Sequence, residues 1–367
     1  MPNRKQISIL GIRGIPASHG GFETFAEILS LYLNKHGWDV TVYCQSALGG
    51  QVMEDDWNGI HRVHVPVAND NALSTINFDY KSTLLASRHD KLILLLGYNT
   101  AVFAFLLRLK SKKIIINMDG IEWKRAKWNW YERAWLYINE RAGCWLGHKL
   151  IADHPEIKRH LMSLVAEDKI VMIPYGGREV SDADEGLLKK YELQPKSYAI
   201  IIARPEPENN ILEIVRAFSK CHHNTKLVVL GAYKEDSEYH LLVRSSAGQN
   251  VRFLGAIYDH KELDALRYYS SLYIHGHTVG GTNPSLVEAL ASGQPVLAHD
   301  NKYNRWVAGE SASYFVDEED CARMLNHLLS DDDLLHKMSS GSRERYQKVF
   351  TWESVLSQYH ELLLQWL

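Results

Sequence analysis

Residues 274–300, with the sequence IHGHTVGGTNPSLVEALASGQPVLAHD, constrain the fold of this chain more than any other stretch. A short apolar run, residues 272–274, leads into a glycine turn. An amphipathic run then starts after Pro284 and ends at Gly293, before a second apolar run at residues 295–298. Proline suits the first position of a helix, and glycine suits the position after its end. The order strand, turn, helix, strand predicts one unit of a parallel sheet with crossover helices.

The turn before this helix consists of Gly280, Gly281, Thr282 and Asn283. Unpaired N–H groups and the positive end of the helix dipole make such a turn suited to a phosphate. Glu288 follows one turn into the helix, within reach of a sugar hydroxyl beside that phosphate. A plain turn whose glycines only close the loop explains the same residues equally well, so both interpretations stay open here.

The same alternation of strands and helices runs through the whole chain of 367 residues and falls into two halves. In the first half, the opening strand leads into a long glycine loop at residues 11–21 and then a helix at residues 22–35. A polar stretch at residues 176–186 separates the halves. We expect the strands at residues 6–11, 40–44, 63–66, 91–96, 113–118, 149–152, 171–174, 198–203, 226–230, 251–254, 272–274, 296–298 and 313–316.

Two such halves predict an α/β fold of two doubly wound, Rossmann-like domains that face each other across a cleft. Residues 1–176 would form the first domain and residues 177–348 the second. Residues 349–367 form an amphipathic helix, which we expect to pack back on the first domain. Ligands of such sheets bind at the carboxyl ends of the strands, where both glycine loops are expected.

Composition excludes several classes of function. The formal net charge of −3 gives no overall field that would attract nucleic acid or an anionic membrane. The four cysteines lie far apart with no CxxC pair, which favours a reducing, cytoplasmic location. The apolar residues 92–109 are interrupted at 97–100, so a membrane-spanning helix is not expected. The DxD pair Asp182 and Asp184 lies in the polar linker, and we predict no metal site.

Two charged residues follow predicted strands. Asp119 is positioned to act as a general base toward a substrate hydroxyl, although an aspartate that caps a turn or helix explains it as well. Arg204 follows the first strand of the second half, where its guanidinium could bridge two phosphate oxygens. A surface arginine is the alternative.

Tryptophans and basic residues gather at residues 122–145, a mixture typical of proteins that sit in a membrane interface. The alternative is that most of these rings belong to the core or cover the cleft. Stacking on single-stranded nucleic acid is disfavoured by the interleaved acids. The acceptor or membrane side would comprise Glu122, Trp123, Lys124, Arg125, Trp128 and Trp130.

Four long motifs, in this order, resemble glycosyltransferase family 4, retaining enzymes of the GT-B architecture. They are GIRGIPASHGGFETFAE from residue 11, MDGIEWKRAKW from residue 118, PENNI from residue 207 and VGGTNPSLVEA from residue 279. More narrowly, they are similar to a bacterial subgroup that contains rhamnosyltransferases of surface-polysaccharide assembly. The resemblance covers nearly the whole chain.

The resemblance implies transfer of a sugar from a nucleotide diphosphate to an acceptor hydroxyl with retention, without a cofactor or metal ion. Asp119 would face the acceptor, Arg204 would stabilise the departing diphosphate, and Glu288 would hold the ribose. These three are the candidate catalytic residues. The donor-binding set would comprise Gly20, Gly21, Arg204, Asn209, Gly280, Gly281, Thr282, Asn283 and Glu288.

Two positions depart from the family pattern. Gly280 stands where the wider family has a glutamate, and Asn209 stands where it has a lysine. Backbone N–H groups of residues 280–283 and Arg204 would then carry more of the diphosphate charge.

The expected function is therefore transfer of L-rhamnose from dTDP-rhamnose to a lipid-linked saccharide at the cytoplasmic face of the membrane. Transfer of a hexose or N-acetylhexosamine from a UDP or GDP donor is the alternative within the same class. A catalytically silent nucleotide- or glycan-binding protein is the alternative outside it.

Overall fold

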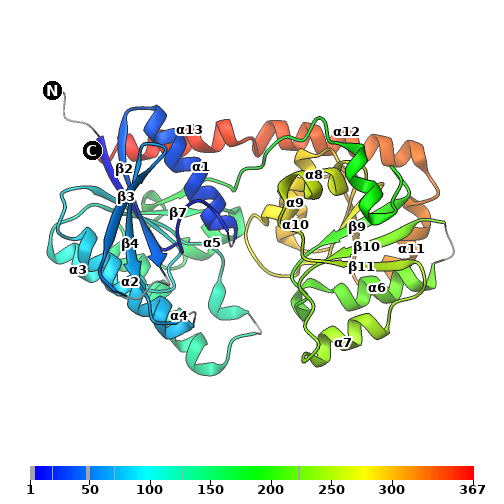
Figure 1. The fold of residues 1–367 in the computed structure, drawn as a ribbon, viewed down its shortest axis with the longest axis horizontal. Coiled ribbons are helices and arrows are strands. Elements are labelled where there is room, and N and C mark those ends of the chain that lie inside the picture. Colours follow the sequence, from blue (N-terminus) through cyan, green and yellow to red (C-terminus); the bar gives the residue numbers. More distant parts are fainter. Residues whose placement is uncertain (1–4, 19, 47–49, 70, 126, 222–223) are drawn as a thin grey trace. The chain divides into compact units, whose positions relative to one another are not determined.

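The computed structural model describes residues 5–18, 20–46, 50–69, 71–125, 127–221 and 224–367 (Figure 1). The chain divides into two compact units, each built on one sheet. Unit 1 comprises Met1–Pro174 together with Val355–Leu367, and unit 2 comprises Tyr175–Ser354. The sequence predicts these boundaries at residues 176 and 348.

The sheet of unit 1 has the strand order β3-β4-β2-β1-β5-β6-β7-β8. Strands β2, β3 and β4 lie on one side of β1, and strands β5 to β8 lie on the other. The strand order therefore reverses between β1 and β5. Its strands are β1 (Lys5–Leu10), β2 (Trp38–Ser46), β3 (Met53–Trp57), β4 (Ile60–Pro66), β5 (Leu92–Leu96), β6 (Ile114–Asn117), β7 (Lys149–Ala152) and β8 (Ile170–Met172). Its helices are α1 (Gly21–Lys35), α2 (Ala72–Ala86), η1 (Ala101–Phe103), α3 (Ala104–Leu109), η2 (Glu122–Lys124), α4 (Trp130–Leu146), α5 (Pro155–Met162), η3 (Glu167–Lys169) and α13 (Trp352–Leu364).

The expectation of an all-parallel sheet in this unit is wrong at one edge. Strand β3 pairs antiparallel with β4, and the sequence pattern gave no sign of it because β3 is exposed and acidic rather than apolar. Pairing across the two strands explains the acids, since Asp55 accepts hydrogen bonds from Arg62 Nε (2.8 Å) and Nη2 (2.6 Å). These contacts hold the pKa of Asp55 at about 2. Charged side chains on an edge strand also discourage pairing with other chains.

From Val355 onward, helix α13 belongs to unit 1, although it follows unit 2 in the sequence. Its buried Tyr359 packs on Phe25 of α1 with ring centroids 4.7 Å apart. The hydroxyl of Tyr359 accepts a hydrogen bond of 2.8 Å from the amide of Asn117 at the end of β6. This buried contact holds the helix beside the carboxyl end of the sheet.

The sheet of unit 2 has the order β11-β10-β9-β12-β13-β14, and neighbouring strands pair in parallel. The order reverses between β9 and β12. Its strands are β9 (Tyr198–Ile202), β10 (Lys226–Leu230), β11 (Val251–Gly255), β12 (Leu272–His275), β13 (Val296–His299) and β14 (Ser313–Phe315). Its helices are η4 (Glu185–Tyr191), η5 (Pro207–Asn209), α6 (Ile211–Lys220), α7 (Glu238–Ser245), α8 (His260–Tyr268), α9 (Pro284–Ala291), α10 (Lys302–Ala308), α11 (Glu318–Leu328) and α12 (Asp332–Val349).

Both faces of this second sheet are buried, as the apolar strands predict. Alternate residues of β9 show it: Ala199 and Ile201 pack with α6 and α11, whereas Tyr198 and Ile200 pack with α9 and α10. Parallel strands covered on both faces read as continuous apolar runs. Polar groups therefore lie at the ends of the strands, and the loops after β9 and β12 follow the carboxyl ends.

Candidate functional site

The loop after β9 and the loop after β12 flank the point in unit 2 where the strand order reverses. In open α/β sheets, ligands bind at such a switch point because the two loops diverge there. The first loop carries Arg204 and Asn209, and the second carries the predicted glycine turn. The structure therefore brings the candidate donor-binding residues of the second half to one end of one sheet.

Three hydrogen bonds lock these loops together. Asn210 donates from Nδ2 to the carbonyl of Gly276 at 3.0 Å. Thr278 donates from its backbone N–H and from its hydroxyl to the carbonyl of Glu208, at 3.0 and 2.9 Å. A Cβ atom at Gly276 would lie 2.1 Å from the carbonyl oxygen of Asn209, so only glycine permits this approach. The two loops are thus held in one arrangement before any ligand binds.

Asn209, which replaces the lysine of the wider family, has a structural role in this arrangement. Its side chain is buried and donates to the carbonyl of Arg204 at 2.8 Å. This bond fixes the backbone from which the Arg204 side chain extends. The Arg204 side chain is exposed, and its guanidinium has no hydrogen bond or ion pair with a described residue. It is therefore available to an anionic ligand.

The glycine turn ends at Asn283, which caps α9 by accepting a 3.1 Å hydrogen bond from the backbone N–H of Ser285. No described residue accepts a hydrogen bond from the N–H groups of Gly280 or Gly281. Gly280 has φ +133°, and a Cβ there would meet nothing within 4 Å. The space beside Gly280 is open, but its backbone conformation favours glycine over the expected glutamate.

Glu288 is partly exposed and forms an ion pair with Arg267, which is 6 % exposed. Local sequence does not predict this partner, because an arginine at the end of α8 gives no local signal of where its side chain points. Arg267 holds one carboxylate oxygen of Glu288, Oε2. The pair fixes the carboxylate at the end of the sheet, so a ribose hydroxyl would meet an oriented acceptor.

Three histidines beside the glycine turn were not predicted as site residues. His275 is buried and stacks on His277, with ring centroids 4.3 Å apart and planes 8° from parallel. Burial, and then the neighbouring His277 and His299, hold the pKa of His275 well below its usual range. Burial also lowers the pKa of His299. Two features of the sequence could have identified these histidines as site residues. They are the His-Gly-His run at 275–277 and the histidine at the end of β13.

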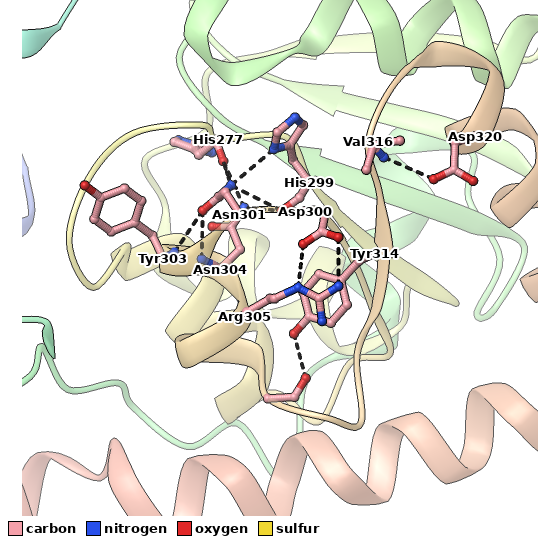
Figure 2. Close-up of polar contacts among 11 residues, drawn as sticks. His277, His299, Asp300, Asn301, Tyr303, Asn304, Arg305, Tyr314, Val316 and Asp320 are labelled. Carbon is pink, nitrogen blue, oxygen red and sulfur yellow. Dashed lines mark hydrogen bonds and ion pairs between the residues drawn. The ribbon is translucent and has the colours of Figure 1, made fainter. Parts of the chain in front are cut away.

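Two asparagines clamp the loops that follow β12 and β13 (Figure 2). Asn301 donates to the carbonyl of His277 at 3.0 Å, and Asn304 donates to the same carbonyl at 2.8 Å. Asn304 also donates to the carbonyl of His299 at 2.9 Å. The clamp holds the backbone of His277 next to the turn, so the turn is supported from this side as well.

In unit 1, the loop after β6 carries Asp119 in a left-handed backbone conformation with φ +51°. Asn117 accepts a 2.9 Å hydrogen bond from the N–H of Asp119 and so stabilises the bend. Burial, and then the nearby Glu122 carboxylate, raise the pKa of Asp119 to about 6. Backbone strain and a raised carboxyl pKa are both features of functional sites. Glu122 itself pairs with Arg125 at 3.1 Å.

The predicted acceptor or membrane cluster does not form one exposed surface. Trp123 and Trp128 are half-buried, and both indole N–H groups are inaccessible. Trp123 packs edge-on against Tyr137, and Lys124 lies over its ring. Trp130, by contrast, is 67 % exposed at the start of α4.

Gly20 and Gly21 lie where the long loop after β1 enters α1. Gly20 is the N-cap of the helix in extended conformation, and Gly21 is its first residue. His19 of this loop lies outside the described residues. The structure therefore places both glycines at the carboxyl ends of the strands of the first sheet, beside the point between β1 and β5 where its strand order reverses.

Within the described residues, no group of three or more His, Cys, Asp or Glu side chains is arranged to hold a metal ion. Among the described helices, none combines the length and apolar character that crossing a membrane requires.

The two units match different family models. Residues 4–178 match a model described as "Domain of unknown function (DUF1972)", and residues 186–345 match "Glycosyl transferases group 1". Among curated proteins, the O-antigen chain mannosyltransferase B of Escherichia coli is 24 % identical over 180 residues, which are 47 % of each chain. The phosphatidyl-myo-inositol mannosyltransferase of Mycobacterium leprae (strain TN) is 27 % identical over 214 residues, 55 % of this chain and 54 % of the relative. The chain thus spans about half the length of these relatives.

Solved structures are similar in fold to this chain over nearly its whole length. Sucrose-phosphate synthase from Thermosynechococcus elongatus has a TM-score of 0.82 at 18 % identity, with 99 % of each chain covered. Anabaena Alr3699/HepE in complex with UDP and glucose has a TM-score of 0.77 at 14 % identity, covering 98 % of this chain and 99 % of that one. The predicted fold class is confirmed: this chain has the GT-B fold, and residues 186–345 of its second unit are similar to the glycosyl transferases group 1 domain.

Proposed function

We propose that this chain transfers a sugar from a nucleotide diphosphate to a saccharide acceptor, with retention of anomeric configuration. The observation that carries the proposal is the site at the switch point of unit 2. There the open N–H groups of Gly280 and Gly281 and the exposed Arg204 lie at one end of a glycosyl transferases group 1 domain. Unit 2 would hold the donor, and unit 1 would hold the acceptor.

In this reaction, an acceptor hydroxyl oxygen bonds to the anomeric carbon from the face that the diphosphate leaves, so the configuration is retained, while the bond between that carbon and the diphosphate breaks. The electron pair stays on the diphosphate, and the hydroxyl proton passes to the carboxylate of Asp119. The main cost is the negative charge that develops on the departing group. Fixed N–H dipoles and a guanidinium already aimed at it typically lower such a barrier by several kcal/mol.

The donor we propose first is dTDP-rhamnose, because the long motifs of this sequence resemble a rhamnosyltransferase subgroup. The names of the two curated relatives favour a second candidate, mannose, for which a GDP donor is the counterpart. A thermal-shift panel of dTDP-rhamnose, GDP-mannose and UDP-glucose decides among them. The true donor should raise the midpoint of unfolding more than its own nucleotide diphosphate does.

No divalent cation is required in this proposal, because the charge of the diphosphate is balanced by Arg204 and backbone N–H groups. We expect transfer to proceed at an unchanged rate in excess EDTA. The measurement is the initial rate with and without the chelator. A loss in EDTA that added Mg²⁺ or Mn²⁺ restores would contradict metal independence.

Asp119 predicts a pH dependence. A general base works only when deprotonated, and its pKa is raised to about 6, so kcat/KM should fall as the pH drops below about 6. Asp119→Asn should lose about 10²–10⁴-fold in kcat and lose this acidic limb of the profile.

The matched control is Asp79→Asn. Burial also raises the pKa of Asp79 to about 6, but its carboxylate accepts a hydrogen bond of 2.9 Å from the hydroxyl of Thr100. This variant should keep both the rate and the acidic limb. A limb that survives in Asp119→Asn and disappears in Asp79→Asn would remove Asp119 from the mechanism.

We also propose that the acceptor is lipid-linked and that unit 1 docks on an anionic membrane surface through α4. Exposed apolar side chains recur along this helix at intervals of seven residues, so they share one face. They are Trp130, Tyr131, Tyr137, Ile138 and Trp145.

Basic groups accompany this face, since Arg141 lies over Tyr137 and Arg133 is exposed. Aromatic rings with basic neighbours suit a headgroup interface. Trp130→Ser combined with Trp145→Ser should reduce sedimentation with anionic liposomes at least about tenfold. Tyr258→Ser, at a residue of unit 2 that is 78 % exposed, is the control. Equal sedimentation of both variants would reject α4 as the docking face.

A protein that binds nucleotide or glycan without catalysis is the remaining alternative. It predicts that a bound nucleotide sugar stays intact in the presence of acceptor extracts. A working transferase predicts transfer, or slow release of free nucleotide diphosphate by hydrolysis.

A further inference from the structure

The buried face of α13 carries a tyrosine hydroxyl among aliphatic side chains. Tyr359 shares this face with Val355, Leu356, Leu362 and Leu363, which recur at helical spacing. A hydroxyl in an apolar interface needs a hydrogen-bond partner, because burying it unpaired costs free energy. The partner lies 242 residues away in the sequence, where Nδ2 of Asn117 at the end of β6 donates to the hydroxyl at 2.8 Å.

The amide of Asn117 is fixed in one orientation by its two hydrogen bonds. Its Oδ1 accepts from the backbone N–H of Asp119 at 2.9 Å, while its Nδ2 donates to Tyr359. An amide rotated by half a turn would point Nδ2 at that N–H, so two donors would face each other. Asn117 and Tyr359 are both buried, where solvent does not readily replace either bond. The tyrosine hydroxyl therefore helps to set the amide orientation that holds Asp119.

The hydroxyl of Tyr359 keeps its proton at neutral pH. Burial raises the pKa of Tyr359, and the hydrogen bond from Asn117 offsets only part of this effect. The side chain is thus a neutral hydroxyl over the pH range in which the activity would be assayed. The contact with Asn117 does not titrate in that range.

Asp119 needs support at its backbone. Its φ of +51° is a left-handed conformation that residues other than glycine adopt at a cost. The other end of the same loop is held separately, because the N–H of Glu122 donates to the hydroxyl of the buried Tyr98 at 2.8 Å. Loss of the Tyr359 hydroxyl would therefore loosen the start of the loop and leave its far end attached.

We propose that Tyr359 is a positioning residue for the general base: through Asn117 it holds the backbone of Asp119 and so aims the carboxylate at the acceptor hydroxyl. This role rests on the proposed function, in which Asp119 takes the proton of that hydroxyl. It assigns helix α13 a part in the reaction besides packing on unit 1.

Amide hydrogen exchange of the full chain, followed by NMR, tests the contact itself, since exchange reports local opening. Tyr359→Phe keeps the ring that packs on Phe25 and removes only the hydroxyl. The amide of Asp119 should then exchange at least about fivefold faster, the ratio that corresponds to loss of one hydrogen bond. The amide of Glu122 should keep its wild-type rate. Unchanged exchange at Asp119, or equal acceleration at both amides, would overturn the proposal.

Kinetics test the consequence for catalysis. Tyr359→Phe should lower kcat about 10–10²-fold, because a shift of a reacting group by about 1 Å is enough for such a loss. The acidic limb of the pH profile should also move to lower pH. Burial and then Glu122 raise the pKa of Asp119 to about 6, and a loosened carboxylate is better solvated. The other charged groups that face it, Arg125 and Lys127, are unchanged in this variant.

The matched control is Tyr198→Phe in unit 2. Tyr198 is also buried, and its hydroxyl donates to the carbonyl of Leu266 at 2.7 Å. This variant likewise loses one buried hydrogen bond, but it should keep the wild-type kcat, pH profile and exchange rate at Asp119. The same defects in Tyr198→Phe would show that they follow from lost stability and not from positioning.

A double-mutant cycle tests the route through Asn117. Asn117→Ala should reproduce the loss in kcat, and adding Tyr359→Phe to it should lower kcat no further, because both changes break one chain of contacts. A second loss of the same size in the double variant would show that Tyr359 acts by another route.

The two measurements separate this role from the proposed function. Exchange is measured without substrate, so faster exchange at Asp119 in Tyr359→Phe together with no sugar transfer by the wild type would reject the proposed reaction, and with it the role of Asp119 as base. Transfer by the wild type with an unchanged kcat and pH profile in Tyr359→Phe would retain the reaction and reject the positioning role.

Discussion

Arg204→Ala is expected to lower kcat/KM for sugar transfer by about 10²–10³-fold, the loss typical when one donor to a developing negative charge is removed. The guanidinium is exposed at the switch point of unit 2 and has no described partner. Among the described residues, truncation of this side chain therefore removes no hydrogen bond or ion pair of the guanidinium. Affinity for the free nucleotide diphosphate should fall as well, since the product carries the same charge.

Arg204→Lys and Arg323→Ala sharpen this test. A lysine keeps the charge but loses the bidentate fork, so Arg204→Lys should recover only part of the rate. Arg323 is exposed on α11, pairs with Asp320 and belongs to neither the loop after β9 nor the loop after β12, so its loss should leave kinetics unchanged. Wild-type diphosphate affinity in Arg204→Ala, measured by calorimetry, would take Arg204 out of the phosphate site.

Glu288→Ala should damage both stability and donor binding. It leaves the guanidinium of Arg267, which is 6 % exposed, without its carboxylate. Removing one partner of a buried ion pair costs about 3–5 kcal/mol, and we expect the lower end because Glu288 is partly exposed. Urea unfolding should therefore show a lower midpoint, and thermal shifts with nucleotide sugars should shrink.

A double variant distinguishes the two effects. Glu288→Leu with Arg267→Met replaces the ion pair by apolar side chains of similar size and should recover most of the lost stability. Donor binding should stay weak in this variant, because no carboxylate remains to accept a ribose hydroxyl. Recovery of donor binding together with stability would show that Glu288 acts only as the partner of Arg267.

The fold was predictable from the sequence because parallel strands buried on both faces are apolar runs that stand out between helices. Strand β5, with the sequence LILLL, is such a case. Strand β3 was not predictable, since its sequence MEDDW is stabilised by charged pairs to the neighbouring strand and not by burial. Such pairing depends on contacts between residues that local periodicity does not encode.

The candidate site was predictable only in outline. The glycine turn and Arg204 could be located because strand ends and helix starts have local signals. The lock between Thr278 and Glu208 and the partner of Glu288 could not, because each joins segments 21 to 70 residues apart. The tryptophan cluster shows the same limit. Helical spacing identifies a shared face only within one helix, whereas Trp123 and Trp128 lie before α4 begins.

The most direct test of the central claim is to incubate the full chain with dTDP-rhamnose, GDP-mannose or UDP-glucose, each labelled in the sugar, and a bacterial lipid extract as acceptor. The proposed function predicts that label from one donor moves into the lipid fraction, or is slowly released as free sugar, with an equal amount of nucleotide diphosphate formed. Arg204→Ala should suppress this turnover. A donor that binds, as shown by a thermal shift, but is recovered intact would contradict the assignment of this chain as an active transferase.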